Sequence, residues 1–194
     1  MKKFDNLLEI KIIFNRDIAM ANFKDSPHFA VHDDYYTPES AWTRISDIIP
    51  KDTLVWEACM LGAEKSKSPD YIMNVSECAM FYSTDMDCLT QEPYDWDMII
   101  TNIPFDKKKK IPILKRFVEL DKPFITLLNS CNLYSNYFRE IFKDNLQYVQ
   151  VIHPKGKINY DKLENGELKK TKNCSFYSVY LCYKMDIPNE KLYL

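Results

Sequence analysis

Glycine is scarce in this sequence, which contains only Gly62, Gly156 and Gly166 among its 194 residues. A nucleotide-binding loop built from several closely spaced glycines is therefore disfavoured. Gly62 directly follows a strongly apolar segment, so a ligand-binding loop is still possible at this position.

The sequence also lacks the patterns of metal sites, disulfide frameworks and membrane segments. Its six cysteines include no C-x-x-C pair and its three histidines complete no zinc pattern, so we expect buried free thiols and no metal ion. No apolar run approaches the roughly 20 residues of a membrane helix. Acidic Asp5 follows Met1 too closely for a secretory signal. We therefore expect a cytoplasmic or otherwise intracellular protein without a membrane partner.

Charge of one sign does not dominate either. A formal net charge of −2 argues against a protein that holds nucleic acid by global electrostatics, although a local basic patch stays compatible with it. The chain is long enough for one sizeable core and too short for two ordinary domains. We expect residues 33–194 to form a single domain and residues 1–32 to form an N-terminal extension that packs on it.

Short apolar runs alternate with segments of helical spacing. Strands are expected at residues 53–56, 79–83, 96–101, 123–128, 148–152 and 176–183. Helices are expected at residues 41–49, 111–120 and 134–142. The basic stretch 162–173 is interpreted as a long loop between the last two strands. This order predicts an α/β fold with a doubly wound, Rossmann-like sheet that is mostly parallel and has an antiparallel terminal strand.

In such a sheet ligands bind outside the carboxyl ends of the strands, so the residues that follow each strand are the site candidates. They are Glu57 after the first strand, Asp85 and Asp87 after the second, Asn102 to Phe105 after the third and Asn129 after the fourth.

The third place carries the most specific pattern. The segment from Tyr94 to Phe105 resembles the catalytic motif of S-adenosylmethionine-dependent amino methyltransferases, which is Asp, Asn or Ser, then Pro or a branched aliphatic residue, then Pro, then an aromatic residue. An adenine amino group is a poor nucleophile while its lone pair is conjugated with the ring. The resemblance implies that the Asn102 side-chain oxygen and the Ile103 carbonyl accept its two N–H groups. Pro104 would stiffen the loop, and Phe105 would stack on an unpaired or flipped-out base. The alternative is an Asn-capped turn followed by a core Phe.

Two upstream segments resemble the cofactor-binding parts of the same family. Tyr36 and Thr37, followed by Pro38, resemble the Tyr-Thr-Pro element that contacts the methionine end of S-adenosylmethionine. Glu57 stands where the family has an acid near the methionine amino group, and Gly62 lies in the loop that wraps the cofactor. The loop departs from the family because Ala58 replaces a proline and one glycine remains of a Gly-x-Gly.

Acids and lysines complete the prediction. Asp85 and Asp87 are expected to accept from the cofactor ribose hydroxyls, the alternative being that they cap a turn. Basic and aromatic residues are expected to contact the substrate, although a lysine run is also typical of a solvated face. These residues are Lys107, Lys108, Lys155, Lys157 and Tyr160.

The resemblance spans roughly residues 33–185 and is closest to compact viral or phage-like adenine methyltransferases, which would place the protein in a host cell. It implies methyl transfer from S-adenosylmethionine to N6 of adenine in DNA or RNA, without a metal. Two alternatives stay open. One is a methyltransferase for another planar amine, such as a protein glutamine amide. The other is a catalytically inactive module that binds nucleic acid or a protein.

Overall fold

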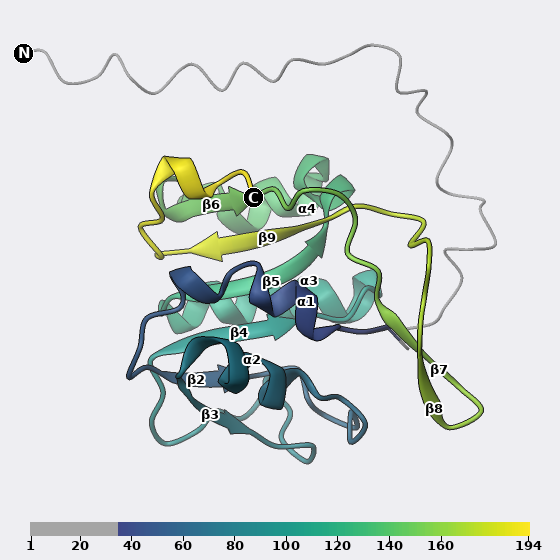
Figure 1. The fold of residues 1–194 in the computed structure, drawn as a ribbon. Coiled ribbons are helices and arrows are strands. Elements are labelled where there is room, and N and C mark those ends of the chain that lie inside the picture. The colour runs from purple at the N-terminus through teal and green to yellow at the C-terminus, as the bar shows by residue number, and fades with distance from the viewer. Residues whose placement is uncertain (1–34) are drawn as a thin grey trace, which may run out of the picture. The chain divides into compact units, whose positions relative to one another are not determined.

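A computed structural model describes residues 35–194 (Figure 1). The expected extension 1–32 lies outside the described residues. The helices of the described part are α1 (Glu39–Thr43), α2 (Ser68–Ser76), α3 (Lys107–Leu120) and α4 (Asn136–Phe142), with short 3-10 turns η2 (Ser46–Ile48), η3 (Ser130–Tyr134), η4 (Leu146–Tyr148) and η5 (Asn189–Lys191). The strands are β1 (Tyr35–Tyr36), β2 (Leu54–Glu57), β3 (Ala79–Tyr82), β4 (Met98–Asn102), β5 (Phe124–Asn129), β6 (Val149–Ile152), β7 (Asp161–Glu164), β8 (Glu167–Lys170) and β9 (Ser178–Tyr183).

Six of these strands form a central sheet in the order β3-β2-β4-β5-β9-β6. Strands β3, β2, β4 and β5 are mutually parallel. Strand β9 is antiparallel to both β5 and β6, which confirms the predicted mostly parallel sheet with an antiparallel terminal strand. The carboxyl ends of β2, β3, β4 and β5 therefore meet at one edge of the sheet.

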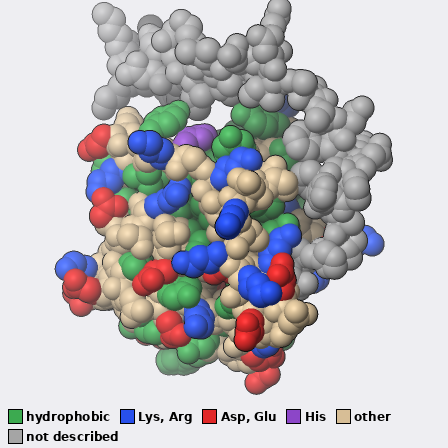
Figure 2. All heavy atoms as spheres, turned by 45° about the vertical axis from the view of Figure 1, so that its right-hand side comes forward, with side chains coloured by type: hydrophobic (Ala, Val, Ile, Leu, Met, Phe, Trp, Pro, Cys, Tyr) green, Lys and Arg blue, Asp and Glu red, His purple; other side chains and the backbone are tan. Residues whose placement is uncertain are grey.

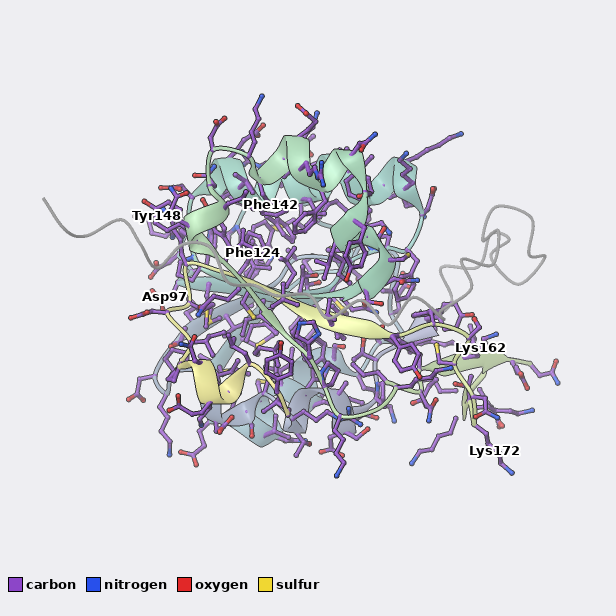
Figure 3. All side chains as sticks on the ribbon, turned by 90° about the horizontal axis from the view of Figure 1, so that it is seen from above. Asp97, Phe124, Phe142, Tyr148, Lys162 and Lys172 are labelled. Atoms are coloured by element: carbon purple, nitrogen blue, oxygen red, sulfur yellow. The ribbon has the colours of Figure 1, made fainter. Side chains whose placement is uncertain are left out.

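The sheet is covered on both faces, which explains why its strands read as continuous apolar runs. Figure 1 shows α1 and α2 on one side of it and α3 and α4 on the other. One buried cluster joins the first face to the two N-terminal helices, with members such as Trp42, Ile72, Ile100 and Leu127. The other joins the second face to α3 and α4, with members such as Trp56, Leu114, Phe124 and Phe142 (Figure 3). Alternate strand residues thus enter opposite cores.

The stretch predicted as a long loop, 162–173, is mostly a β-hairpin, so that prediction was wrong. Strands β7 and β8 are antiparallel and are joined by Asn165 and Gly166, whose φ angles of 52° and 82° suit a two-residue hairpin turn. Strand β7 pairs in turn with β1, so Tyr35 lies opposite Lys162. The hairpin therefore forms a second, three-stranded sheet with the first described residues.

Two predicted helices need correction, and one helix was missed. The helix expected at 41–49 is the short α1 followed by the 3-10 turn η2. Helix α2 was not predicted, and residues 83–97 between β3 and β4 contain no helix. Helix α3 begins at Lys107 rather than Ile111, because the Asp106 side chain caps it by accepting from the Lys108 amide at 3.0 Å. In residues 35–194, no helix has the length and apolar character needed to cross a membrane.

Candidate functional site

The motif Asn102 to Phe105 lies at the carboxyl end of β4, in the middle of the parallel strands. Asn102 is the last residue of the strand and pairs with Leu127 of β5. Its side-chain oxygen Oδ1 is buried and has no hydrogen-bond partner in the described part of the chain. An unsatisfied buried acceptor costs roughly 1–3 kcal/mol, so it is unusual unless a ligand supplies the donor. Ile103, the next residue, is buried.

Phe105 is half-buried in a cluster of aromatic rings that come from distant segments. Its ring centroid lies 5.6 Å from that of Tyr35, 5.5 Å from that of Tyr160 and 5.0 Å from that of Phe176. The three contacts are edge-on, a favourable arrangement for aromatic pairs. These contacts hold the Phe105 ring beside Asn102. The alternative interpretation, in which Phe105 is a core residue, is only partly correct, because the packed ring also lines a cavity.

A cavity of about 250 Å³ opens at this edge of the sheet. Its walls come from the Tyr-Thr-Pro element, the loop after β2 and the motif after β4, so three segments that the sequence singled out separately meet here. The predicted residues that line it are Tyr36, Thr37, Glu57, Gly62, Asn102, Ile103, Pro104 and Phe105. The volume is slightly below the roughly 300–1,000 Å³ typical of small-molecule sites.

Glu57 is the carboxylic acid of the cavity and is 3% exposed. Its Oε1 accepts hydrogen bonds from the Thr101 hydroxyl and from the Cys59 amide, the latter at 3.3 Å. The Cys59 thiol is neutral as well, because its hydrogen bond with Cys88 and its burial raise its pKa. Burial among neutral groups raises the pKa of Glu57 to about 8. The carboxyl therefore holds a proton at neutral pH unless a cation enters the cavity.

The raised pKa of Glu57 predicts a pH-dependent difference in stability between the wild type and Glu57→Gln. The folded protein keeps the proton to about pH 8, whereas the unfolded chain loses it near 4.5, so the wild type loses stability as pH rises through that interval. Glutamine keeps the acceptor oxygen and cannot ionise. Thermal unfolding without ligand should therefore favour Glu57→Gln increasingly from pH 5 to pH 8. Glu39→Gln, at an exposed position, is the control, and equal pH profiles for all three proteins would contradict the assignment.

The reduced cofactor loop does not block the cavity. Leu61 is 56% exposed, and a Cβ placed on Gly62 would meet no atom within 4 Å. Gly62 has a φ of 68°, and its amide donates to the Thr84 carbonyl at 3.0 Å, which joins the loops after β2 and β3. On the opposite side, Lys65 donates to the carbonyl of Gly166 in the hairpin at 2.7 Å. The loop is thus tied at both ends without being filled.

Asp85 and Asp87 follow β3 as expected, but neither lines the cavity. Asp85 is exposed, and Asp87 Oδ1 accepts from the Leu89 amide at 3.0 Å. Asp87 therefore has the turn-capping arrangement that was the alternative interpretation. Contact of either acid with a ribose stays a prediction.

The predicted substrate residues divide into exposed and buried ones. Lys107 and Lys108 are exposed in the first turn of α3, and Lys155 is exposed with its carbonyl accepting from Arg44. Lys157 is half-buried and donates to the Cys174 carbonyl at 2.9 Å. Tyr160 requires a correction, because it is completely buried and its hydroxyl donates to Ser178 at 2.8 Å. Its ring packs against that of Phe105, and because it is buried it does not contact a substrate directly.

Several cavity residues escaped the sequence reasoning. Lys109, rather than Lys107 or Lys108, is the lysine that lines the cavity. Ser66 and Ser68, at the start of α2, also line it. The Ser-x-Ser-Pro-Asp sequence is a recognisable helix start and could have indicated a helix N-terminus near the cofactor loop. Within residues 35–194, no group of three or more His, Cys, Asp or Glu residues could hold a metal ion.

Comparison with protein-family models gives no match, and comparison with curated proteins also gives none. Solved structures do match. A structure described as a candidate class I S-adenosylmethionine-dependent methyltransferase from Listeria monocytogenes superposes with a TM-score of 0.53 at 10% identity, covering 86% of this chain and 67% of that chain. The chain therefore has the Rossmann-like fold of the class I methyltransferases, as the sequence predicted.

Two further similar structures have lower TM-scores. A candidate rRNA methylase from Clostridium thermocellum gives 0.44 at 8% identity, covering 76% of this chain and 94% of that chain. A candidate methyltransferase from Streptococcus mutans in complex with SAH gives 0.38 at 9% identity, covering 75% and 96%. At these identities the likeness concerns the fold.

Proposed function

We propose that this chain binds S-adenosylmethionine in the cavity and transfers its methyl group to N6 of an adenine base in DNA or RNA. The observation that carries the proposal is the buried, unsatisfied Oδ1 of Asn102, next to the half-buried ring of Phe105 at the cavity wall. An amide acceptor beside an aromatic face suits a planar heterocycle that bears an amino group.

The cavity fits the proposed cofactor in its chemistry. Glu57 offers a buried carboxyl that an ammonium group would ionise and pair with, as the methionine end of the cofactor requires. Tyr36 and Thr37 form the facing wall, and the open backbone at Gly62 leaves room for close approach. When bound, the cofactor supplies an electrophilic methyl group on a sulfonium. The chain itself has to bind, orient and exclude water.

Asn102 and Ile103 have the positioning role in the proposed reaction. The Asn102 Oδ1 accepts one N–H of the adenine amino group and the Ile103 carbonyl accepts the other, which turns the nitrogen lone pair out of conjugation. With the cofactor bound, its methyl group would pass to N6 as the carbon–sulfur bond breaks, and N6 would then release one proton to solvent. The β4–β5 pairing holds the Asn102 backbone, and its Oδ1 has no hydrogen-bond partner in the described part of the chain.

The acceptor class is tested by side-by-side methyl transfer. The full chain is incubated with labelled S-adenosylmethionine and single-stranded DNA, duplex DNA, RNA or protein, and the modified nucleoside or amino acid is then identified. N6-methyladenine in nucleic acid supports the proposal. Label on a glutamine amide would replace it with the planar-amine alternative. If S-adenosylmethionine gave no calorimetric signal, the chain would instead be the inactive binding module. The exposed Leu61 and the open cavity argue against that outcome.

Replacing Phe105 should separate the base from the cofactor. We expect Phe105→Ala to weaken binding of the target base by roughly 1–3 kcal/mol, because stacking is lost, while the affinity for S-adenosylmethionine changes little. Phe105→Tyr keeps a stacking ring and serves as the conservative control. Oligonucleotide affinity and cofactor affinity are measured on the same preparations. Equal losses for both ligands would show that Phe105 only supports the fold of the site through its aromatic contacts.

A further inference from the structure

Two exposed tyrosines lie at the same edge of the sheet as the cavity, and the proposed reaction does not use them. Tyr134 is 63% exposed at the end of η3, and Tyr177 is 59% exposed just before β9. Single exposed aromatic side chains are common on protein surfaces, so the relevant observation is that two of them lie at this edge together with basic side chains. Their position relative to Phe105 follows from three contacts.

The first contact joins Tyr177 to the motif. Phe176, the preceding residue, packs with its ring 5.0 Å from that of Phe105. Phe176 is half-buried whereas Tyr177 is exposed, so the two neighbouring side chains lie on different sides of the extended chain. Tyr177 therefore directly follows Phe176, the residue that packs on Phe105, and its side chain is directed toward solvent.

The second contact joins Tyr177 to the segment that carries Tyr134. The Ser130 amide donates to the Tyr177 carbonyl at 2.9 Å, next to the β5–β9 pair Asn129 and Ser178. Tyr134 lies at the other end of the same 3-10 turn, Ser130–Tyr134. Both tyrosines thus flank the edge at which β4 and β5 end.

The third contact fixes the ring of Tyr177. Lys157 Nζ lies 4.9 Å from the ring centroid and also donates to the Cys174 carbonyl. A cation held against one part of an aromatic ring restricts its motion and adds a positive charge beside it. We call Tyr134, Tyr177, Lys155 and Lys157 the tyrosine platform.

The charge of the surrounding segments is one-sided. Residues 129–139, 153–160 and 169–178 contain no aspartate or glutamate, whereas the hairpin residues between the last two segments include Asp161, Glu164 and Glu167, and Glu164 pairs with Lys169 at 3.4 Å. The three segments contain six basic residues, which are Arg139, Lys155, Lys157, Lys169, Lys170 and Lys172. Asp106, the acid of the neighbouring motif loop, has its side chain engaged in capping α3. Figure 2 shows basic side chains across the middle of this face, with acidic side chains beside and below them, and Figure 3 shows Lys162 and Lys172 on the hairpin.

From this combination we infer that the tyrosine platform binds the unpaired nucleotides that flank the target base, so the substrate is a single-stranded rather than a duplex nucleic acid. Tyrosine rings stack on bases only where the base faces are free, and in a duplex those faces are stacked on each other. Lysines beside the rings neutralise the phosphates of the same strand. A strand that is already unpaired also presents its target base without the cost of flipping it out. The inference rests on the proposed function, whose substrate it narrows.

Fluorescence anisotropy with the full-length protein and labelled adenine-containing oligonucleotides tests the inference. The probes are one single strand as DNA, the same sequence as RNA, and the DNA duplex, all at the same salt concentration. We expect at least one single strand to bind about tenfold tighter than the duplex. Tyr177→Ala should weaken single-strand binding by between about 5-fold and about 150-fold, and Tyr134→Ala should act in the same direction.

Tyr148 provides a matched control at the opposite edge of the sheet. It is 44% exposed and has Lys184 Nζ 5.1 Å from its ring, so it reproduces the Tyr177–Lys157 pair away from the cavity (Figure 3). Tyr148→Ala should leave oligonucleotide binding unchanged, and S-adenosylmethionine affinity should be unchanged in all three variants.

The outcomes separate the two proposals. Duplex binding as tight as single-strand binding, or equal effects of Tyr177→Ala and Tyr148→Ala, would overturn the role of the platform and leave the proposed methyl transfer standing. Failure to bind S-adenosylmethionine, with platform-dependent strand binding intact, would overturn the proposed function and not the platform. A variant that also loses cofactor affinity is replaced by Tyr177→Leu, which removes stacking while retaining an apolar side chain.

Discussion

Asn102→Ala should reduce methyl transfer by roughly 100- to 1,000-fold without weakening S-adenosylmethionine binding. Enzymes typically lose this much rate when one pre-positioned hydrogen-bonding group at the reacting centre is removed. Removing the side chain deletes a buried acceptor that has no partner within the described structure, so little stability is lost. The measurement is single-turnover methyl transfer together with calorimetric cofactor binding.

Two companion variants make the Asn102 result specific. Asn102→Asp retains an acceptor oxygen at the same place and should recover measurable transfer, since the family motif also accommodates Asp. Asn74→Ala, on the exposed surface of α2, should behave as the wild type. Wild-type turnover in Asn102→Ala would show that the amide is not part of the mechanism.

Cofactor affinity should rise by about tenfold between pH 6 and pH 7, and by a smaller factor between pH 7 and pH 8, where Glu57 approaches half-ionisation. The Glu57 carboxyl has a pKa of about 8 in the ligand-free protein because it is buried, and only its ionised form pairs with an ammonium. Binding below pH 8 therefore releases a proton from Glu57, and above pH 8 that carboxyl is already ionised. Titration calorimetry in two buffers with different ionisation enthalpies would detect the released proton directly.

Glu57→Gln gives the corresponding control for the pH effect. It should bind S-adenosylmethionine more weakly, by roughly 1.5–3 kcal/mol for a hydrogen bond to a charged group, and the pH dependence should disappear. Glu39→Gln should retain the wild-type profile. If the wild-type dissociation constant were the same at pH 6 and pH 8, Glu57 would not be the partner of the cofactor ammonium.

The sheet was predictable because its strands are buried on both faces. Segments such as Met98 to Asn102 therefore contain nearly continuous apolar residues, and the site follows from where those strands end. The hairpin β7–β8 was missed although Asn165-Gly166 is a two-residue hairpin signal, because the lysines around it were interpreted as a solvated loop. Its alternating pattern is weak, since the strands are short and each of their residues is either exposed or only partly buried.

The orientation of individual side chains was less predictable than their strands. Tyr160 lies among lysines in the sequence, yet its ring is buried against Phe105 and Phe176, which are 55 and 16 residues away. Lys109 lines the cavity while Lys107 and Lys108 do not, because the Asp106 cap sets the phase of α3. Contacts of this kind depend on tertiary packing, and they cannot be predicted from the local amino-acid composition.

The position of β9 between β5 and β6 determines when the site can be completed during synthesis. Strand β6 is synthesised before residues 178–183, yet β9 is its neighbour in the sheet. Tyr35, which packs on Phe105, likewise pairs with β7, far later in the chain. A nascent chain that ends before β7 contains every proposed cofactor and catalytic residue but lacks the partners that hold them. The proposed cofactor site is therefore expected to depend on the strands that are synthesised last.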